Sequence, residues 1–205
     1  MKAPSSTPAS DALLTPHAAI GQRRDMASHH HAEPSRGATE ARPELRVARP
    51  DESAPADEMT MARGWLTHLR ESAIFKLEDL DDAQLRWKPA STANSLGAIV
   101  VHLGYAERLW LRVVFDGETM DMSWRQNMFV IPRAWSVEDV VRFYRSESAA
   151  ADAVLDRAAS LDLPSAGVMR PTTLRWIVNH LLEETARHVG HMDITRELLD
   201  GRTGR

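Results

Sequence analysis

The stretch HLLEETARHVGHMDITRELLDG, residues 180–201, decides the fold. Its apolar residues recur at the three- and four-residue spacing of an amphipathic α-helix, and a glycine stands where such a helix would end. At about 100° per residue, Glu184, His188 and His191 lie within roughly 80° of His180, on an arc that continues into the apolar stripe. We therefore expect these ionisable groups to face the protein interior. An unpaired buried carboxylate is strongly unfavourable, so Glu184 needs a proton, a hydrogen bond or a cation.

Three further helical segments precede this one, and no alternating strand pattern of useful length is present. The four predicted helices cover residues 58–80, 96–115, 136–159 and 172–200. Ser95 and Ser136 are suited to capping the second and third helices, and Thr172 or Thr173 opens the fourth. A capping box is expected at the third. The sequence thus predicts an all-α domain, a four-helix bundle spanning residues 58–205.

A long connection, residues 116–135, joins the second and third predicted helices. Its methionines and aromatic residues make it too apolar for a solvated linker, so we expect it to fold over one end of the bundle. Trp65, Trp110 and Trp176 stand at core spacing and are interpreted as packing residues rather than as a stacking platform.

The amino-terminal region, residues 1–57, differs in composition from the rest of the chain. It is rich in Pro, Ala, Ser and alternating charge, and the first aromatic residue is Trp65. Such a segment buries too little apolar surface to offset the entropy of ordering it, so we expect a disordered tail. An over-extended gene start, with Met59 or Met61 as the true first residue, is the alternative.

Composition excludes several classes of protein. There is no cysteine, which excludes disulfides, a thiolate nucleophile and Cys-ligated metal centres. The net charge of −4, with arginines scattered among acids, offers no footprint for nucleic acid. A secretory signal and a membrane span are both unexpected, because no sufficiently long apolar run occurs. We expect a cytoplasmic protein with a small-molecule substrate.

His102, Glu184 and His188 are the candidate metal ligands. Glu184 and His188 are one helical turn apart, so their tips can meet on one ion. His102 lies on an aliphatic stripe of the second helix, where it could face them across the bundle. Two imidazoles and one carboxylate form the ligand set of open catalytic zinc sites, and the same set suits ferrous iron or nickel.

The alternative is a hydrogen-bonded core histidine beside an ordinary helical Glu–His pair. His191 is interpreted first as a group that orients a ligand or as a pocket acid/base, and only then as a ligand. His180 is expected to cap the site or pack in the core. Glu107, about 140° from His102 on the helix, is predicted to be an interhelical partner. The tract His29–His31 is interpreted as incidental.

Three segments carry a resemblance to a known family: FKLEDLDDAQLRWKPASTANSLGAIVVHL at 75–103, LGAIVVHLGYAERLWLRVVFDGE at 96–118, and TLRWIVNHLLEETARHVGHMDITRELLDG at 173–201. Over about 60–203 the chain resembles the DinB-like superfamily of metal-binding four-helix bundles, specifically its mini-circle branch. The resemblance implies a long crossover and a divalent ion held by His102 and by Glu184 and His188. Many relatives have His-x-x-x-His at the latter pair, whereas Glu-x-x-x-His is similar to the mycothiol-dependent maleylpyruvate isomerases.

The resemblance implies a metal-dependent transferase or isomerase that uses a low-molecular-weight thiol such as mycothiol or bacillithiol. The ion would bind the thiol and lower its pKa, and His191 would assist by proton transfer or by orienting a ligand. The rival hypothesis is a stress-associated metal-binding bundle without turnover, as a homodimer joined through exposed helix faces. A metal-free helical interaction module is the third.

Overall fold

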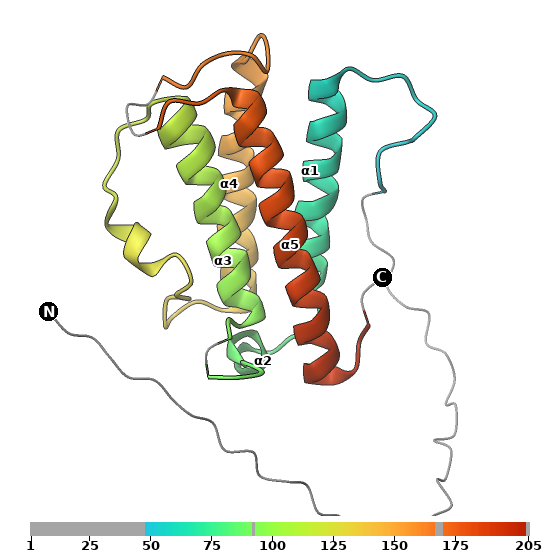
Figure 1. Cartoon of the computed structure of the whole chain (residues 1–205). Helices are drawn as coiled ribbons and strands as arrows, with labels where there is room; N and C mark the ends of the chain where they lie inside the picture. Colours follow the sequence, from blue (N-terminus) through green and yellow to red (C-terminus); the bar gives the residue numbers. More distant parts are fainter. Residues whose placement is uncertain (1–47, 92, 167–169, 204–205) are drawn as a thin grey trace, which may run out of the picture. The chain divides into compact units, whose positions relative to one another are not determined.

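The computed structural model describes residues 48–91, 93–166 and 170–203, and this part of the chain is helical (Figure 1). The elements are α1 (Glu58–Phe75), α2 (Asp82–Arg86), α3 (Leu96–Glu107), the π-helical segment η1 (Arg108–Phe115), the 3₁₀ segment η2 (Ser123–Asn127), α4 (Val137–Arg157) and α5 (Leu174–Asp200). The predicted all-α four-helix bundle is confirmed, with α1, α3, α4 and α5 as its long helices. Among the described residues, no helix has the length and apolar character needed to cross a bilayer.

The caps predicted from sequence set the ends of the helices that carry the candidate site. The Ser95 hydroxyl accepts a hydrogen bond from the Ala98 N–H at the start of α3 (3.2 Å). Thr173 is the N-cap of α5, and Gly201 ends it in the left-handed conformation, with φ of 77°. The capping box expected at Ser136 is present at the start of α4. Since each cap satisfies backbone groups that the helix leaves unpaired, local sequence determines where α3 and α5 begin.

The first helix is shorter than the predicted range 58–80, so the prediction is wrong at the carboxyl end of this helix. α1 ends at Phe75, and Asp79 adopts a positive φ of 60°, which an α-helix does not tolerate. The carboxylate of Asp81 then accepts hydrogen bonds from the Ala83 and Gln84 N–H groups, which starts α2, a short helix that is not among the four predicted from sequence.

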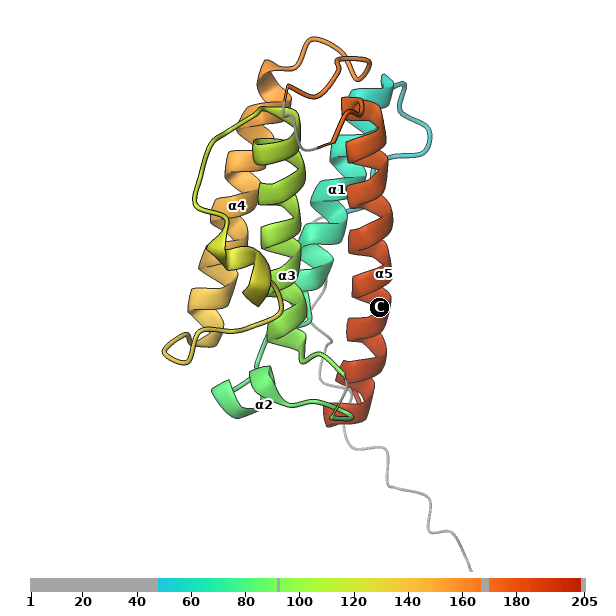
Figure 2. The same cartoon turned by 60° about the vertical axis from the view of Figure 1, so that its left-hand side comes forward.

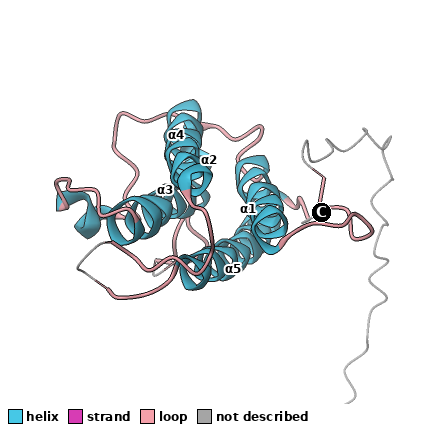
Figure 3. Ribbon diagram, turned by 90° about the horizontal axis from the view of Figure 1, so that it is seen from above, coloured by secondary structure: helices cyan, strands magenta, loops and turns pink. Residues whose placement is uncertain are grey.

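α3 is the most buried helix of the bundle. Eleven of its twelve residues are buried, whereas the sequence pattern indicated a single apolar stripe. Viewed from above, α3 lies between α4 and α5 (Figure 3). Gly104 permits the close approach of α4, because a Cβ at this position would lie 2.7 Å from Cε1 of Phe143. The segment 116–135 covers a third side of α3, so little of this helix reaches solvent.

The connection 116–135 was expected to fold over one end of the bundle, and this prediction is wrong. α3 and α4 run in the same direction, so the chain must return along the bundle before α4 begins, and the connection lies alongside α3 (Figure 2). Trp124 stacks on Tyr105 with ring centroids 5.0 Å apart, and Phe129 stacks on His102. The connection is therefore a crossover that brings its aromatic side chains to the α3 face.

A buried ion pair joins α1 to α3. The Arg70 guanidinium donates to both carboxylate oxygens of Glu107, at 2.9 and 2.6 Å, and to Asp152 of α4 at 2.8 Å. Arg70 and Glu107 are 6% and 1% exposed. The prediction of Glu107 as an interhelical partner is confirmed, and the pair ties three helices together.

Residues 48–57 of the expected tail are described. Pro50 lies against α1 at Gly64, where a Cβ would come within 2.9 Å of the Pro50 Cγ atom. Residues 1–47, which include the tract His29–His31, lie outside the described residues.

Candidate metal centre

His102 of α3 is held in a nearly closed environment. Its residue exposure is 8%, and it stands among the aliphatic side chains of a helix that starts at the Ser95 cap. The Phe129 ring stacks on its imidazole at a centroid distance of 3.9 Å and an interplanar angle of 10°. The Nε2 atom lies 2.8 Å from Oε1 of Glu184. The crossover and α5 thus determine the orientation of this ring together.

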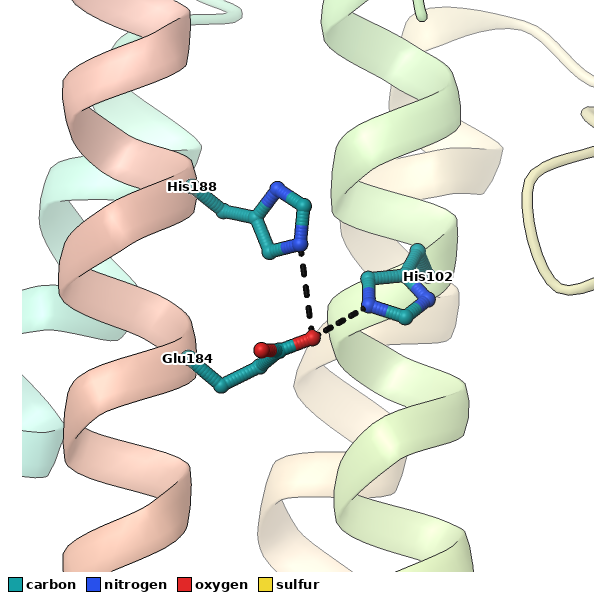
Figure 4. A group of neighbouring side chains, drawn as sticks. All are labelled: His102, Glu184 and His188. Atoms are coloured by element: carbon teal, nitrogen blue, oxygen red, sulfur yellow. Dashed lines mark hydrogen bonds and ion pairs between the residues drawn. The ribbon is translucent and has the colours of Figure 1, made fainter. Parts of the chain in front are cut away.

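Glu184 and His188 come from successive turns of α5 and point toward His102 (Figure 4). The Nε2 atom of His188 lies 3.4 Å from Oε1 of Glu184, the same oxygen that His102 contacts. One ligand-capable atom from each of the three residues lies within 4.8 Å of the others. The side chains of Glu184 and His188 are 20% and 12% exposed, so these two residues are only partly open to solvent.

Burial sets the protonation of the two histidines. It lowers the pKa of His102, although the hydrogen bond with Glu184 acts in the opposite direction. It also lowers the pKa of His188, with a further contribution from the nearby His102. Burial alone would raise the pKa of Glu184, but the contacts with His102 and His188 bring it below its usual value. At neutral pH the site therefore holds neutral imidazoles beside an ionised carboxylate, the forms that bind a divalent metal.

The Nδ1 atoms of His102 and His188 are buried and have no hydrogen-bond partner among the described residues. Without a cation, the ionised Glu184 accepts a hydrogen bond from Nε2–H of His102 at 2.8 Å, which places the proton of that ring on Nε2. A cation beside Glu184 would reverse this, because no described group opposes a proton on Nδ1, and each ring would then direct its Nε2 lone pair at the ion. With two such lone pairs and a carboxylate oxygen converging, the donor set fits a divalent cation.

His191 and His180 do not lie on the buried face, contrary to the expectation drawn from the helical arc. His191 is exposed, and its ring stands 5.7 Å from that of His188 in an edge-to-face arrangement. His180 is half-buried against Trp176 and Trp110. The buried face of α5 consists mainly of Leu174, Ile177, Val178, Leu181, Thr185 and Met192. The centre of this buried face lies roughly 120° from His180 around the helix axis. The four ionisable residues of α5 therefore lie along the edge of the buried face, and His188 is the one closest to the core.

Three aromatic residues have surroundings that sequence reasoning missed. Phe129 contacts His102, and the only signal was the apolar character of the connection that carries it. Trp176 was interpreted as a core residue, but 46% of it is exposed. Trp65 is likewise 36% exposed, so the packing prediction holds for Trp110 alone. Helical spacing shows which face a residue occupies, but not how far the neighbouring helices cover that face.

Comparison with known proteins identifies the family and the fold. The sequence model of the mycothiol-S-transferase family matches residues 61–201. A solved structure titled the conserved protein of locus from Enterococcus faecalis is similar in fold, with a TM-score of 0.57. The two chains are 14% identical, and the match covers 72% of this chain and 100% of the other. A search of curated proteins found no match.

The bundle and its crossover define a DinB-like helical protein. The chain belongs to the mycothiol-S-transferase family, whose model extends from the first turn of α1 to the end of α5 and includes all three candidate ligands.

Proposed function

We propose that this protein is a divalent-metal-dependent transferase or isomerase that uses a low-molecular-weight thiol, with mycothiol as the thiol that the family name indicates. The observation that carries the proposal is the convergence of His102, Glu184 and His188 within 4.8 Å inside a bundle of this family. We propose zinc as the ion, because two imidazoles and one carboxylate are the ligands of open catalytic zinc sites.

A divalent ion at this position would lower the pKa of a coordinated thiol, so that the sulfur is a thiolate at neutral pH. Glu184 contributes one negative charge against the charge of the cation. His102 and His188 contribute neutral donors, so the site would retain a net positive charge that favours an anionic sulfur. Phe129 covers the His102 ring and keeps water from that face. The chain has no cysteine, so the sulfur must arrive with the cosubstrate.

His191 is the proposed proton-transfer group. It is exposed at the edge of the site, beside His188, where it can exchange protons with solvent. A positioned general acid/base contributes roughly 100-fold or more to a rate. We therefore expect His191→Gln to retain the bound metal and lower kcat by about that factor, with a smaller effect on the KM for the thiol.

Metal content tests the assignment of the ligands. Full-length protein purified without nickel chromatography should contain stoichiometric metal by elemental analysis, and His188→Ala should lose it. A chelator should lower the Tm of the wild type and leave that of His188→Ala unchanged, because a bound ion stabilises only the folded state. The variant with His29, His30 and His31 all changed to Ala is the matched control and should keep its metal. Equal metal content in wild type and His188→Ala would refute the assignment.

Turnover is tested separately. The zinc-loaded protein should accelerate the reaction of mycothiol with an electrophilic probe above the rate with thiol alone. If the protein binds stoichiometric metal but does not accelerate the reaction, the transferase hypothesis is wrong and a non-catalytic metal-binding bundle is supported. Absence of stoichiometric metal would indicate a helical interaction module.

A further inference from the structure

A cluster of four cationic and aromatic side chains stands at the amino-terminal end of α5. Trp176 stacks on His180 with ring centroids 5.1 Å apart and an interplanar angle of 19°. Trp110 of η1 completes the group, 5.1 Å from the Trp176 ring and 4.7 Å from that of His180. The Arg170 guanidinium lies over both indoles, 5.5 Å from Trp110 and 5.9 Å from Trp176. We call these four residues the aromatic–Arg cluster.

The aromatic–Arg cluster continues the same row of α5 that carries the candidate ligands. Trp176, His180, Glu184 and His188 follow one another at intervals of four residues. Residues at this spacing are neighbours on a helix surface. With a rise of about 1.5 Å per residue, His180 precedes Glu184 by roughly 6 Å along the axis and Trp176 precedes it by roughly 12 Å. The His180 edge of the cluster therefore lies within about one ring length of the candidate metal centre, and Trp176 lies one turn further away.

The chemistry of the cluster selects a particular kind of molecule. Trp176 is 46% exposed, so part of an indole is available to a ligand. Arg170 is exposed, and among the residues that the structure describes no carboxylate forms an ion pair with it. The other arginines facing the bundle at this end are paired, as Arg175 is with Glu58 and Asp162. Planar π surfaces beside an unpaired guanidinium match an aromatic ring that bears a carboxylate, since Arg recognises that group through two parallel hydrogen bonds.

We propose that the aromatic–Arg cluster is the binding site for a planar aromatic carboxylate whose ring also carries a halide, and that this molecule is the acceptor of the thiol. The sulfur forms a bond to the ring carbon, the carbon–halogen bond breaks, the halide leaves as an anion, and the thiol proton passes to solvent. The ring packs against the exposed part of Trp176 that His180 leaves uncovered, and the carboxylate pairs with Arg170 at the end away from Glu184. The reactive carbon then points along α5 toward the candidate metal centre. The role as acceptor rests on the proposed function, whereas binding of the ring and carboxylate requires only the cluster.

Binding to chelator-treated, full-length protein tests the proposal without any catalysis. The probes are 3,5-dinitrobenzoate and 1,3-dinitrobenzene, which differ by one carboxylate, and titration calorimetry reports the dissociation constants. Arg170→Met should weaken binding of 3,5-dinitrobenzoate roughly tenfold and leave 1,3-dinitrobenzene unchanged, because only the charged hydrogen bonds are lost. Trp176→Leu should weaken both probes by a similar factor, since stacking does not depend on the carboxylate.

The matched controls are Trp65→Leu, which removes another part-exposed indole, and Arg125→Met, which removes an exposed arginine of the crossover. Neither should change binding of either probe. Equal affinity of wild type and Arg170→Met for 3,5-dinitrobenzoate, or an equal loss in the control variants, would overturn the proposal. His188→Ala should bind both probes as the wild type does. The probe titration therefore tests the aromatic–Arg cluster alone, and the metal content of His188→Ala tests the metal ligands alone.

Discussion

The buried ion pair between Arg70 and Glu107 provides a test of how the bundle is held together. We predict that Arg70→Met destabilises the protein more than Glu107→Gln, by about 1.5–2 kcal/mol. In Arg70→Met, the Glu107 carboxylate loses both of its hydrogen bonds from the guanidinium while remaining 1% exposed. In Glu107→Gln, the guanidinium keeps its 2.8 Å contact with Asp152, and the amide oxygen of the new side chain can still accept a hydrogen bond.

The magnitudes follow from these contacts. Removing one partner of a buried pair and leaving the other charged costs about 3–5 kcal/mol. Loss of one charge-assisted hydrogen bond with the rest retained costs about 1.5–3 kcal/mol. For a bundle of this size, each kcal/mol lowers the Tm by roughly 2–4 °C. We therefore expect Arg70→Met to lose on the order of 6–20 °C and Glu107→Gln roughly 3–12 °C.

Acidification supplies a second measurement on the same variant. Burial raises the pKa of Glu107, and the ion pair with Arg70 opposes that rise. Removal of Arg70 therefore moves the folded-state pKa further above its unfolded value. A buried carboxylate with a raised pKa destabilises the fold when ionised, so Arg70→Met should regain stability relative to wild type as the pH falls through that raised pKa.

The assay is urea unfolding followed by circular dichroism, at neutral pH and at a pH near 5. The control is Arg142→Met, which removes a solvent-exposed i,i+3 pair with Asp139 and should change stability by less than about 1 kcal/mol. Equal stability of Arg70→Met and Glu107→Gln at neutral pH, with no relative gain for Arg70→Met in acid, would show that Glu107 is not left as an uncompensated charge and would refute the reasoning.

Gly104→Ala should destabilise the protein by about 1–3 kcal/mol, because the new Cβ meets an α4 ring at 2.7 Å. Gly190→Ala is the matched change in α5; nothing lies within 4 Å of its Cβ, so it should stabilise by about 0.5–1 kcal/mol, and unfolding in urea measures both. Phe129→Ala removes the ring stacked on His102, an interaction worth about 0.5–1.5 kcal/mol, and should weaken metal binding roughly two- to tenfold in a competitive chelator titration. Phe129→Tyr should preserve the affinity, and an unchanged affinity in Phe129→Ala would show that the stacking does not position His102.

The sequence determined the helices and much of the candidate site because the signals involved are local. Apolar periodicity and the caps at Ser95, Ser136 and Thr173 depend on residues within one or two turns of each other, and the structure contains these caps. The spacing of Glu184 and His188 likewise belongs to a single helix, so their contact could be inferred before any packing was known.

Only the tertiary structure decided which residues from different helices meet and how deeply each is covered. The 2.8 Å contact of His102 with Glu184 depends on the relative position of α3 and α5. The stacking of Phe129 depends on the parallel course of α3 and α4, which sends the crossover back along the bundle. The exposure of His191 and Trp176 depends on where the neighbouring helices stop covering α5. Helical periodicity defines a direction around one axis, whereas burial is set by the distance to the next helix, and no local pattern contains that distance.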